Sequence, residues 1–191
     1  DASIQTSDGR IGFVIGMGET PNPIRVAASL LDEDINGLSG DGARSYADKK
    51  GHKRSPVQGR KNFDGATDTV GVLARDRDGI IVCATSTGGC SDMPPGRVGD
   101  VPLPGSGFWV HEGVGVGATG IGEAITRGLL SFKVADLISR GGEIEKSMMK
   151  ALDESIEEGA EVGIIALSSE GTGHGISNSE NMPWASWIAR K

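Results

Sequence analysis

The sequence predicts a single α+β domain over residues 1–191, in which strands and helices come in separate blocks. Apolar strand-like runs gather in the middle of the chain, and helical patterns follow them, which favours antiparallel sheets with segregated helices over alternating βαβ units. A length of 191 residues is enough for one substantial core. The 31 glycines, beside only 4% aromatic residues, indicate tight turns and close backbone approaches. We therefore expect a layered domain whose helices cover the faces of its sheets.

The first third of the chain contains one strand pattern and one helix pattern. Residues 9–17 form a short apolar run bounded by glycines, which predicts a strand. Residues 22–34 predict a helix, with Pro23 suited to its first turn. Residues 37–67 are polar and lack periodicity, so we expect an exposed segment that ends in a flexible linker at about residues 48–68.

The middle of the chain predicts a β-hairpin. The apolar runs "TVGVLA" and "IIVCATST" flank "RDRDG", in which Asp78 and Gly79 give a strong turn signal. Both runs are nearly continuous in apolar residues, so we expect both faces of both strands to be covered. The sequence "GRVGDVPLPGSGFWV" then predicts a glycine- and proline-rich loop that enters another short strand.

The last third predicts two helices and a second hairpin. The helices are expected at residues 123–140 and 143–158, the second with apolar residues at four-residue steps. These residues are Ile144, Met148, Leu152 and Ile156. The sequence "VGIIALSSEGTGHGIS" predicts two strands joined by a glycine-rich turn.

Composition excludes several classes of function. A formal net charge of -7 without a large basic run argues against nucleic-acid binding, and no apolar stretch is long enough to span a membrane. Cys83 and Cys90 make no disulfide framework, so we expect a reduced, cytoplasmic compartment. His52, His111 and His174 lack metal-ligand spacing, and we expect neither a metal nor a cofactor.

Two familiar motifs fit the sequence poorly. The run "GVGATG" at residues 115–120 matches the dinucleotide pattern G-x-G-x-x-G, with Asp136 downstream, but a hairpin and a proline-rich loop precede it instead of a βαβ unit. Such a pattern also arises by chance in a glycine-rich chain. A serine-hydrolase elbow is absent, because "PGSGF" around Ser106 lacks the G-x-S-x-G spacing.

Thr69 offers a third kind of chemistry. It opens a strand directly after Asp68, at the end of the polar segment. If the peptide bond before Thr69 were broken, the new α-amino group would lie within reach of the threonine hydroxyl. An α-amine has a pKa of about 7.7–8.0, so it can accept a proton near neutral pH and activate that hydroxyl. The other interpretation is that Thr69 is only a β-branched strand former.

Two further clusters suit an amidohydrolase. Arg97 and Asp100 lie three residues apart in "GRVGD", where they match the carboxylate and ammonium groups of an amino acid, or else form a surface ion pair. Thr119, Gly120 and Gly122 lie at a predicted strand-to-helix junction, where free N–H groups stabilise developing negative charge.

Together these segments resemble one family. "TDTVGVLARDRDGIIVCATSTGG", "GRVGDVPLPGSG" and "GATGIGE" are similar to the N-terminal-nucleophile (Ntn) hydrolases of the plant-type asparaginase group. Its members include isoaspartyl peptidase/L-asparaginase, glycosylasparaginase and threonine aspartase. The resemblance covers nearly the whole chain. It implies a four-layer αββα sandwich, the Ntn-hydrolase fold, and assembly as a dimer of αβ units. We expect this sandwich to lack the family's usual N-terminal strand and helix.

The resemblance also implies how the chain is processed. Autocatalytic cleavage between Asp68 and Thr69 would give an α-chain portion, residues 1–68, and a β-chain portion, residues 69–191. Thr69 would then be the nucleophile, and Thr87 would hydrogen-bond to it and tune it.

The remaining site residues are assigned by the same resemblance. Arg97 and Asp100 would hold the α-carboxylate and α-amino groups of a small-molecule or short-peptide β-aspartyl substrate. Thr119 and Gly120 would form the oxyanion hole, and Gly122 would line the head-group pocket.

Three functions remain open at this point, beside the more remote possibility of a dinucleotide-binding protein. The first is hydrolysis of β-aspartyl amides, either L-asparagine or isoaspartyl peptides, through an aspartyl-enzyme. The second is glycosylasparaginase activity, because Asp68 precedes the nucleophile as it does in those enzymes, whereas "TSTGG" resembles the asparaginase branch. The third is a nonprocessing homologue that serves as a binding or assembly module.

Overall fold

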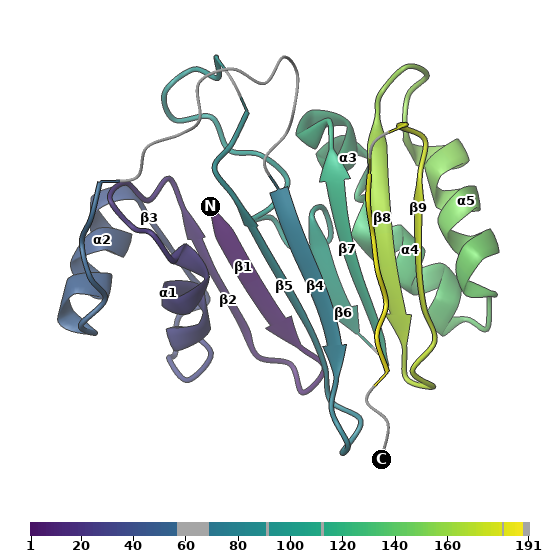
Figure 1. Ribbon diagram of the computed structural model, residues 1–191, viewed down its shortest axis with the longest axis horizontal. Coiled ribbons are helices and arrows are strands. Elements are labelled where there is room, and N and C mark those ends of the chain that lie inside the picture. Colours follow the sequence, from purple (N-terminus) through teal and green to yellow (C-terminus); the bar gives the residue numbers. More distant parts are fainter. Residues whose placement is uncertain (57–68, 91, 112, 181, 189–191) are drawn as a thin grey trace.

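The protein folds into two β-sheets and five helices within the residues that the computed structural model describes, which are 1–56, 69–90, 92–111, 113–180 and 182–188 (Figure 1). The α+β class predicted from the sequence is confirmed. In the described part of the chain, no helix has the length and apolar character that crossing a membrane requires.

The first sheet has five strands in the order β3-β2-β1-β5-β4. β2 and β3 pair in parallel and the other neighbours are antiparallel, so the sheet is mixed. Its strands are β1 (Ala2–Thr6), β2 (Ile11–Ile15), β3 (Gly37–Ser39), β4 (Thr69–Arg75) and β5 (Ile81–Thr87).

The second sheet has four antiparallel strands in the order β6-β7-β8-β9. They are β6 (Phe108–His111), β7 (Val114–Gly120), β8 (Val162–Ser168) and β9 (Gly173–Ser177). The hairpin predicted near the end of the chain is therefore confirmed as β8 and β9.

Three apolar clusters hold these elements together. One joins β1 and β2 to α1 (Pro23–Ser29) and α2 (Gly40–Lys49), and includes Val14, Val26 and Ala47. A second joins β7 and β8 to the helices α3 (Gly122–Gly128), α4 (Leu130–Ser139) and α5 (Ile144–Ser155). The third lies where the two sheets meet, and is built on Ile81, Cys83, Phe108 and Val110.

The predicted hairpin of β4 and β5 is confirmed, but one expectation about it is wrong. β5 lies between β1 and β4, whereas β4 is the edge strand of its sheet. Val70 and Val72 of β4 are 62% and 57% exposed. The apolar pattern of β4 therefore does not mean that both of its faces are covered among the described residues.

The predicted polar segment contains a strand and a helix that the sequence did not suggest. β3 and α2 lie within it, and β1 precedes the first strand that was expected. In α2, Ala43, Arg44 and Ala47 are buried, and Gly51 follows the helix with φ 78°. The small residues at these helical spacings gave little apolar signal, although the glycine just after the helix is typical of a helix end. Residues 57–68, which carry the rest of the expected linker, lie outside the described residues.

The helix expected at residues 123–140 is two helices. α3 ends and α4 begins at Leu129, whose φ of 48° is in the left-handed region. A left-handed residue cannot continue an α-helix, so the chain changes direction there. α5 agrees with the second predicted helix and ends slightly earlier, at Ser155.

The glycine run at residues 115–120 lies inside β7 and does not form a nucleotide-binding turn. β7 pairs with β6 on one side and β8 on the other. A Cβ on Gly115 would lie 2.8 Å from Cγ2 of Ile81 and 3.1 Å from Cδ2 of Leu73, which belong to the other sheet. The glycine spacing therefore reflects close packing of the two sheets, and the dinucleotide interpretation is wrong.

Candidate active site

Thr69 is the first residue of β4 and lies directly across from Thr87, the last residue of β5. The hydroxyl of Thr69 donates a hydrogen bond to Oγ1 of Thr87 at 3.1 Å. The same oxygen accepts a hydrogen bond from the backbone N–H of Gly89 at 3.0 Å. The two threonines that the sequence singled out are thus in contact, at the end of the hairpin opposite its turn.

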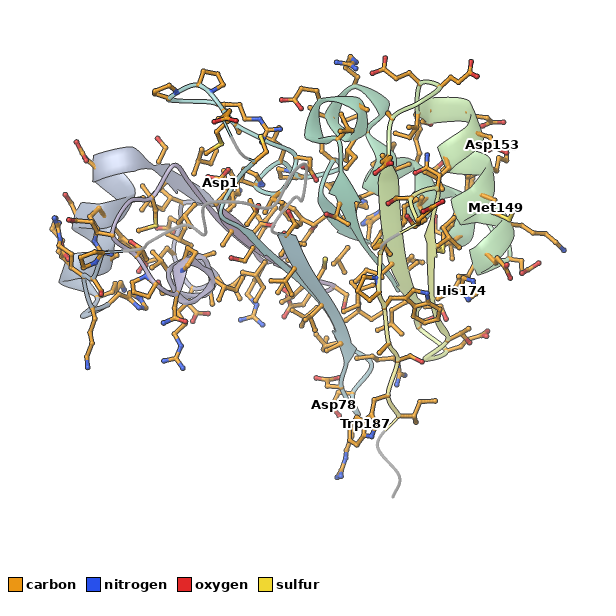
Figure 2. The ribbon with its side chains drawn as sticks, turned by 45° about the horizontal axis from the view of Figure 1, so that its top comes forward. Asp1, Asp78, Met149, Asp153, His174 and Trp187 are labelled. Atoms are coloured by element: carbon orange, nitrogen blue, oxygen red, sulfur yellow. The ribbon has the colours of Figure 1, made fainter. Side chains whose placement is uncertain are left out.

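Figure 2 shows the two ends of this hairpin. Asp1 marks the threonine end, because its backbone carbonyl accepts a hydrogen bond from the N–H of Thr87. Asp78 marks the turn between β4 and β5, at the opposite end of the strands.

Stacking of the sheets brings the end of β7 toward the same place. Ile81 of β5 lies against Gly115 of β7, and Cys83 of β5 lies against Gly117. A Cβ added to Gly117 would lie 3.7 Å from Sγ of Cys83. β5 and β7 therefore advance in the same direction, and both end at the upper edge in Figure 1. The predicted Thr119 and Gly120, the last residues of β7, consequently lie at the same end of the sheets as Thr69 and Thr87.

A buried hydrogen-bond cluster fixes the turn that carries Asp100. The carbonyl of Val101 accepts hydrogen bonds from the hydroxyls of Ser3 (2.8 Å) and Thr85 (3.3 Å). The carbonyl of Asp100 accepts one from the N–H of Gly107. Because Thr85 lies on β5, the Asp100 turn is tied to the sheet that carries the two threonines.

The predicted head-group residues Arg97, Asp100 and Gly122 meet in space. A Cβ on Gly122 would lie 2.7 Å from Oδ1 of Asp100 and 3.0 Å from Nη2 of Arg97. A larger residue would displace both charged groups, so glycine lets the start of α3 approach them.

Asp100 is buried without its full set of hydrogen bonds. The residue is 6% exposed, and among the described residues Oδ2 has no hydrogen-bond partner. Burial raises the pKa of Asp100 to about 6. A buried carboxylate oxygen without a partner is costly, and a bound ammonium group would satisfy it.

Arg97 has a different partner from the one that its spacing suggested. Within the described part of the chain it pairs with Glu123, not with Asp100. Its Nε and Nη2 donate to the two carboxylate oxygens of Glu123, each at 2.9 Å. These hydrogen bonds hold the pKa of Glu123 below its usual range. The simple surface ion pair between Arg97 and Asp100 is therefore the wrong interpretation of "GRVGD".

Glu123 is the site residue that sequence reasoning missed. It directly follows Gly122 in "ATGIGE", and it was taken only as the start of a helix. Its charge gave no sign of this role, because an acidic residue in the first turn of a helix is ordinary. Nothing in the spacing identifies it as the partner of Arg97, since Glu123 is 26 residues from Arg97.

Gly120 has a backbone that only glycine adopts readily. Its φ is 132°, and a Cβ would lie 2.2 Å from the backbone oxygen of Glu161. This conformation turns the chain out of β7 toward α3. Gly120 thus ends β7 two residues before Gly122, which contacts the head-group residues. Asp68, on the other side of the expected scission, lies outside the described residues.

Two surface hollows lie away from this cluster. One, of about 640 Å³, lies between α5 and β9 and includes Met149 and Asp153, which are labelled in Figure 2. The other, of about 510 Å³, includes His174. In the part of the chain that the structure describes, no three His, Cys, Asp or Glu side chains are grouped so as to hold a metal ion.

Comparison with known proteins shows which family the sequence matches. The family model described as Asparaginase matches residues 52–191. The chain is 37% identical to a plant-type L-asparaginase of Pyrobaculum calidifontis, over 76% of this chain and 56% of that protein. It is 32% identical to an isoaspartyl peptidase of Escherichia coli, over 91% of this chain and 63% of that protein. It is also 28% identical to an N(4)-(beta-N-acetylglucosaminyl)-L-asparaginase of Elizabethkingia miricola, over 90% of this chain and 58% of that protein.

These matches define the family. The chain belongs to the asparaginase family, to which the resemblance in the sequence pointed. It spans between 56% and 63% of the length of the three relatives named above.

Proposed function

We propose that the protein is an autoprocessed threonine amidohydrolase that cleaves β-aspartyl amide bonds, in L-asparagine, isoaspartyl peptides or both. The observation that carries this proposal is the hydrogen bond between Thr69 and Thr87. It lies near the end of β5, where Thr85 is hydrogen-bonded to the turn that carries Asp100. The names of the relatives from Pyrobaculum calidifontis and Escherichia coli support the same substrate class.

The head-group residues support an α-amino acid substrate. Oδ2 of Asp100 lacks a partner among the described residues and suits an α-ammonium group. Arg97 suits an α-carboxylate, because a guanidinium binds a carboxylate through two parallel hydrogen bonds. An aspartyl head group carries both charges on one carbon atom, which matches two charged side chains that meet at Gly122.

The proposed chemistry begins with cleavage of the chain itself. Oγ1 of Thr69 attacks the carbonyl carbon of Asp68, and the C–N bond of the peptide breaks to give an ester and the free α-amine of Thr69. Water then hydrolyses the ester, leaving Asp68 with a carboxylate. The product is a threonine whose own amine acts as the general base.

Substrate turnover repeats these steps on a side-chain amide. The α-amine of Thr69 takes the hydroxyl proton while Oγ1 attacks the β-carbonyl carbon, and the oxyanion is held by Thr119 and Gly120. The amine returns the proton to the leaving nitrogen as the C–N bond breaks, which releases ammonia or an amino-terminal amine. Water then attacks the aspartyl ester, and Oγ1 leaves with a proton, which releases aspartate. Before the amine takes the hydroxyl proton, Thr87 orients Oγ1 of Thr69 by accepting its hydrogen bond, and this bond breaks as the proton moves to the amine.

The proposal includes the architecture that the resemblance implies. We infer that the two sheets and their covering helices form a four-layer αββα sandwich, with residues 1–68 and 69–191 as its α and β portions and a dimer of αβ units as the assembly. Contacts of β5 with β7, and packing of helices on the outer side of each sheet, support the layers. The free cysteines Cys83 and Cys90 support a reduced compartment such as the cytoplasm.

A second candidate substrate is glycosylated asparagine. It is favoured by Asp68, which precedes the nucleophile as in glycosylasparaginases, and by the name of the relative from Elizabethkingia miricola. Both substrates present the same aspartyl head group, so Arg97 and Asp100 do not distinguish them. The two substrates differ in the leaving group.

The test is intact mass and turnover of the purified protein. We expect two polypeptides that meet between Asp68 and Thr69, and release of ammonia from L-asparagine or of aspartate from β-aspartyl dipeptides. Replacing Thr69 with Ala is expected to abolish both scission and turnover. A stable single chain without activity would instead identify a nonprocessing binding module, and preferred turnover of glycosylated asparagine would establish the second candidate.

A further inference from the structure

The pair formed by Arg97 and Glu123 differs from an ordinary surface ion pair. The Arg97 side chain is 18% exposed and that of Glu123 is 53% exposed, and both carboxylate oxygens of Glu123 accept hydrogen bonds at 2.9 Å. In contrast, the pair of Arg127 with Glu157 joins side chains that are 61% and 60% exposed, through one hydrogen bond. The glutamate of the first pair therefore fixes the orientation of a largely buried guanidinium.

The contact leaves a definite part of Arg97 free. An arginine side chain has donors on Nε, Nη1 and Nη2. Glu123 takes Nε and one hydrogen of Nη2, and within the described residues no further hydrogen bond of this guanidinium is found. The donors that remain are on Nη1 and Nη2, and together they form a second edge able to bind a carboxylate.

The free edge lies beside the buried carboxylate of Asp100. Nη1 lies 2.8 Å from the position of a Cβ on Gly99, and Nη2 lies 3.0 Å from that of a Cβ on Gly122. Oδ1 of Asp100 lies 2.7 Å from the same point on Gly122. Side chains at Gly99 and Gly122 would meet these charged groups, so the two glycines allow Arg97 and Asp100 to lie side by side.

We propose that Glu123 is a positioning residue, which clamps one edge of Arg97 so that the other edge binds the α-carboxylate of the substrate. This inference rests on the proposed function, because it assigns Arg97 to the substrate head group. It makes Glu123 a determinant of specificity for substrates with a free α-carboxylate. Glu123 itself does not touch the substrate.

The test compares binding of two head groups to the full-length protein. L-aspartate has a free α-carboxylate, whereas L-isoasparagine carries an α-carboxamide in its place. With Glu123→Gln, we expect calorimetry to show about tenfold weaker binding of L-aspartate and nearly unchanged binding of L-isoasparagine, because only the carboxylate needs the oriented arginine. Thermal unfolding of the variant checks that it is folded.

Two controls separate positioning from general effects. Glu157→Gln removes the glutamate of the exposed pair with Arg127 and should leave the ratio of the two affinities unchanged. With Arg97→Gln, the affinity for L-aspartate divided by that for L-isoasparagine should fall. Adding Glu123→Gln to that variant should lower this ratio no further, because Glu123 acts through Arg97. A further fall in the double variant would overturn the inference.

Other outcomes bear on the inference in opposite ways. Equal weakening of both ligands would overturn it, and so would tighter binding of L-aspartate, because Glu123 would then be a competing carboxylate. Failure of the unmodified protein to bind L-aspartate would overturn it as well. Selective binding of L-aspartate that is lost with Glu123→Gln, in a protein without hydrolase activity, would support the inference and refute the proposed function.

Discussion

Asp100→Asn is expected to stabilise the protein at neutral pH while removing its affinity for substrate. Burial raises the pKa of Asp100 from its usual 3.8 to about 6. Each pH unit of difference between the folded and unfolded pKa corresponds to about 1.4 kcal/mol, so ionised Asp100 lowers the free energy of unfolding by about 3 kcal/mol. Asparagine stays neutral at every pH and avoids this cost.

The effect has a definite dependence on pH. Because the folded pKa lies above the unfolded one, the folded state binds more protons, and the contribution of Asp100 to stability is lost as pH rises from 3.8 through about 6. The free energy of unfolding of the Asn variant, minus that of the parent, should therefore increase by about 2–3 kcal/mol between about pH 4 and pH 7. Arg97 and Glu123 are the charged neighbours of Asp100, and their opposite influences are part of the same pKa.

Urea unfolding followed by tryptophan fluorescence measures this difference. The parent for the comparison carries Thr69→Ala, so that both proteins are single polypeptides. A difference that stays constant from about pH 4 to pH 7 would refute the assignment of a raised pKa to Asp100. In the same variant, L-aspartate should bind about 30-fold more weakly or worse, because its ammonium group loses a buried charged partner.

Three further perturbations test the rest of the site and its support. Thr87→Val removes the hydroxyl that accepts the hydrogen bond from Thr69. In steady-state kinetics, this variant should show kcat lowered about 10- to 100-fold with little change in KM. An unchanged kcat would exclude a role for this contact. Gly120→Ala should lower the free energy of unfolding in urea by about 2–4 kcal/mol, because φ is 132° and the new Cβ would meet the backbone oxygen of Glu161. An unchanged free energy of unfolding would contradict this account of the Gly120 backbone. Burial raises the pKa of Cys83 to about 12, so its thiol should resist alkylation in the folded protein and react after unfolding. Peptide mass mapping detects the alkylated residue. Alkylation of Cys83 in the folded protein would contradict its burial.

Several elements were predictable because their signals are local. The turn at Asp78 and the two apolar runs around it specify the β4–β5 hairpin, and so set Thr69 opposite Thr87. The four-residue spacing from Ile144 onward specifies α5. In contrast, α2 was missed because two alanines and an arginine, Ala43, Arg44 and Ala47, make up its buried face and give little apolar signal. The break at Leu129 was missed because a left-handed backbone cannot be recognised from an apolar pattern.

Strand and helix periodicity and turn chemistry act over short distances along the chain, so the α+β class, the hairpin and the residue types that an amidohydrolase needs could be predicted from the sequence. Three features became visible only in the folded chain: among the described residues, β4 is an edge strand, Asp100 is buried with an unpartnered oxygen, and Arg97 pairs with Glu123. Burial and ion pairing depend on which surfaces meet when the two sheets and α3 pack together. Residues 26 positions apart become partners there, and no local pattern encodes that distance.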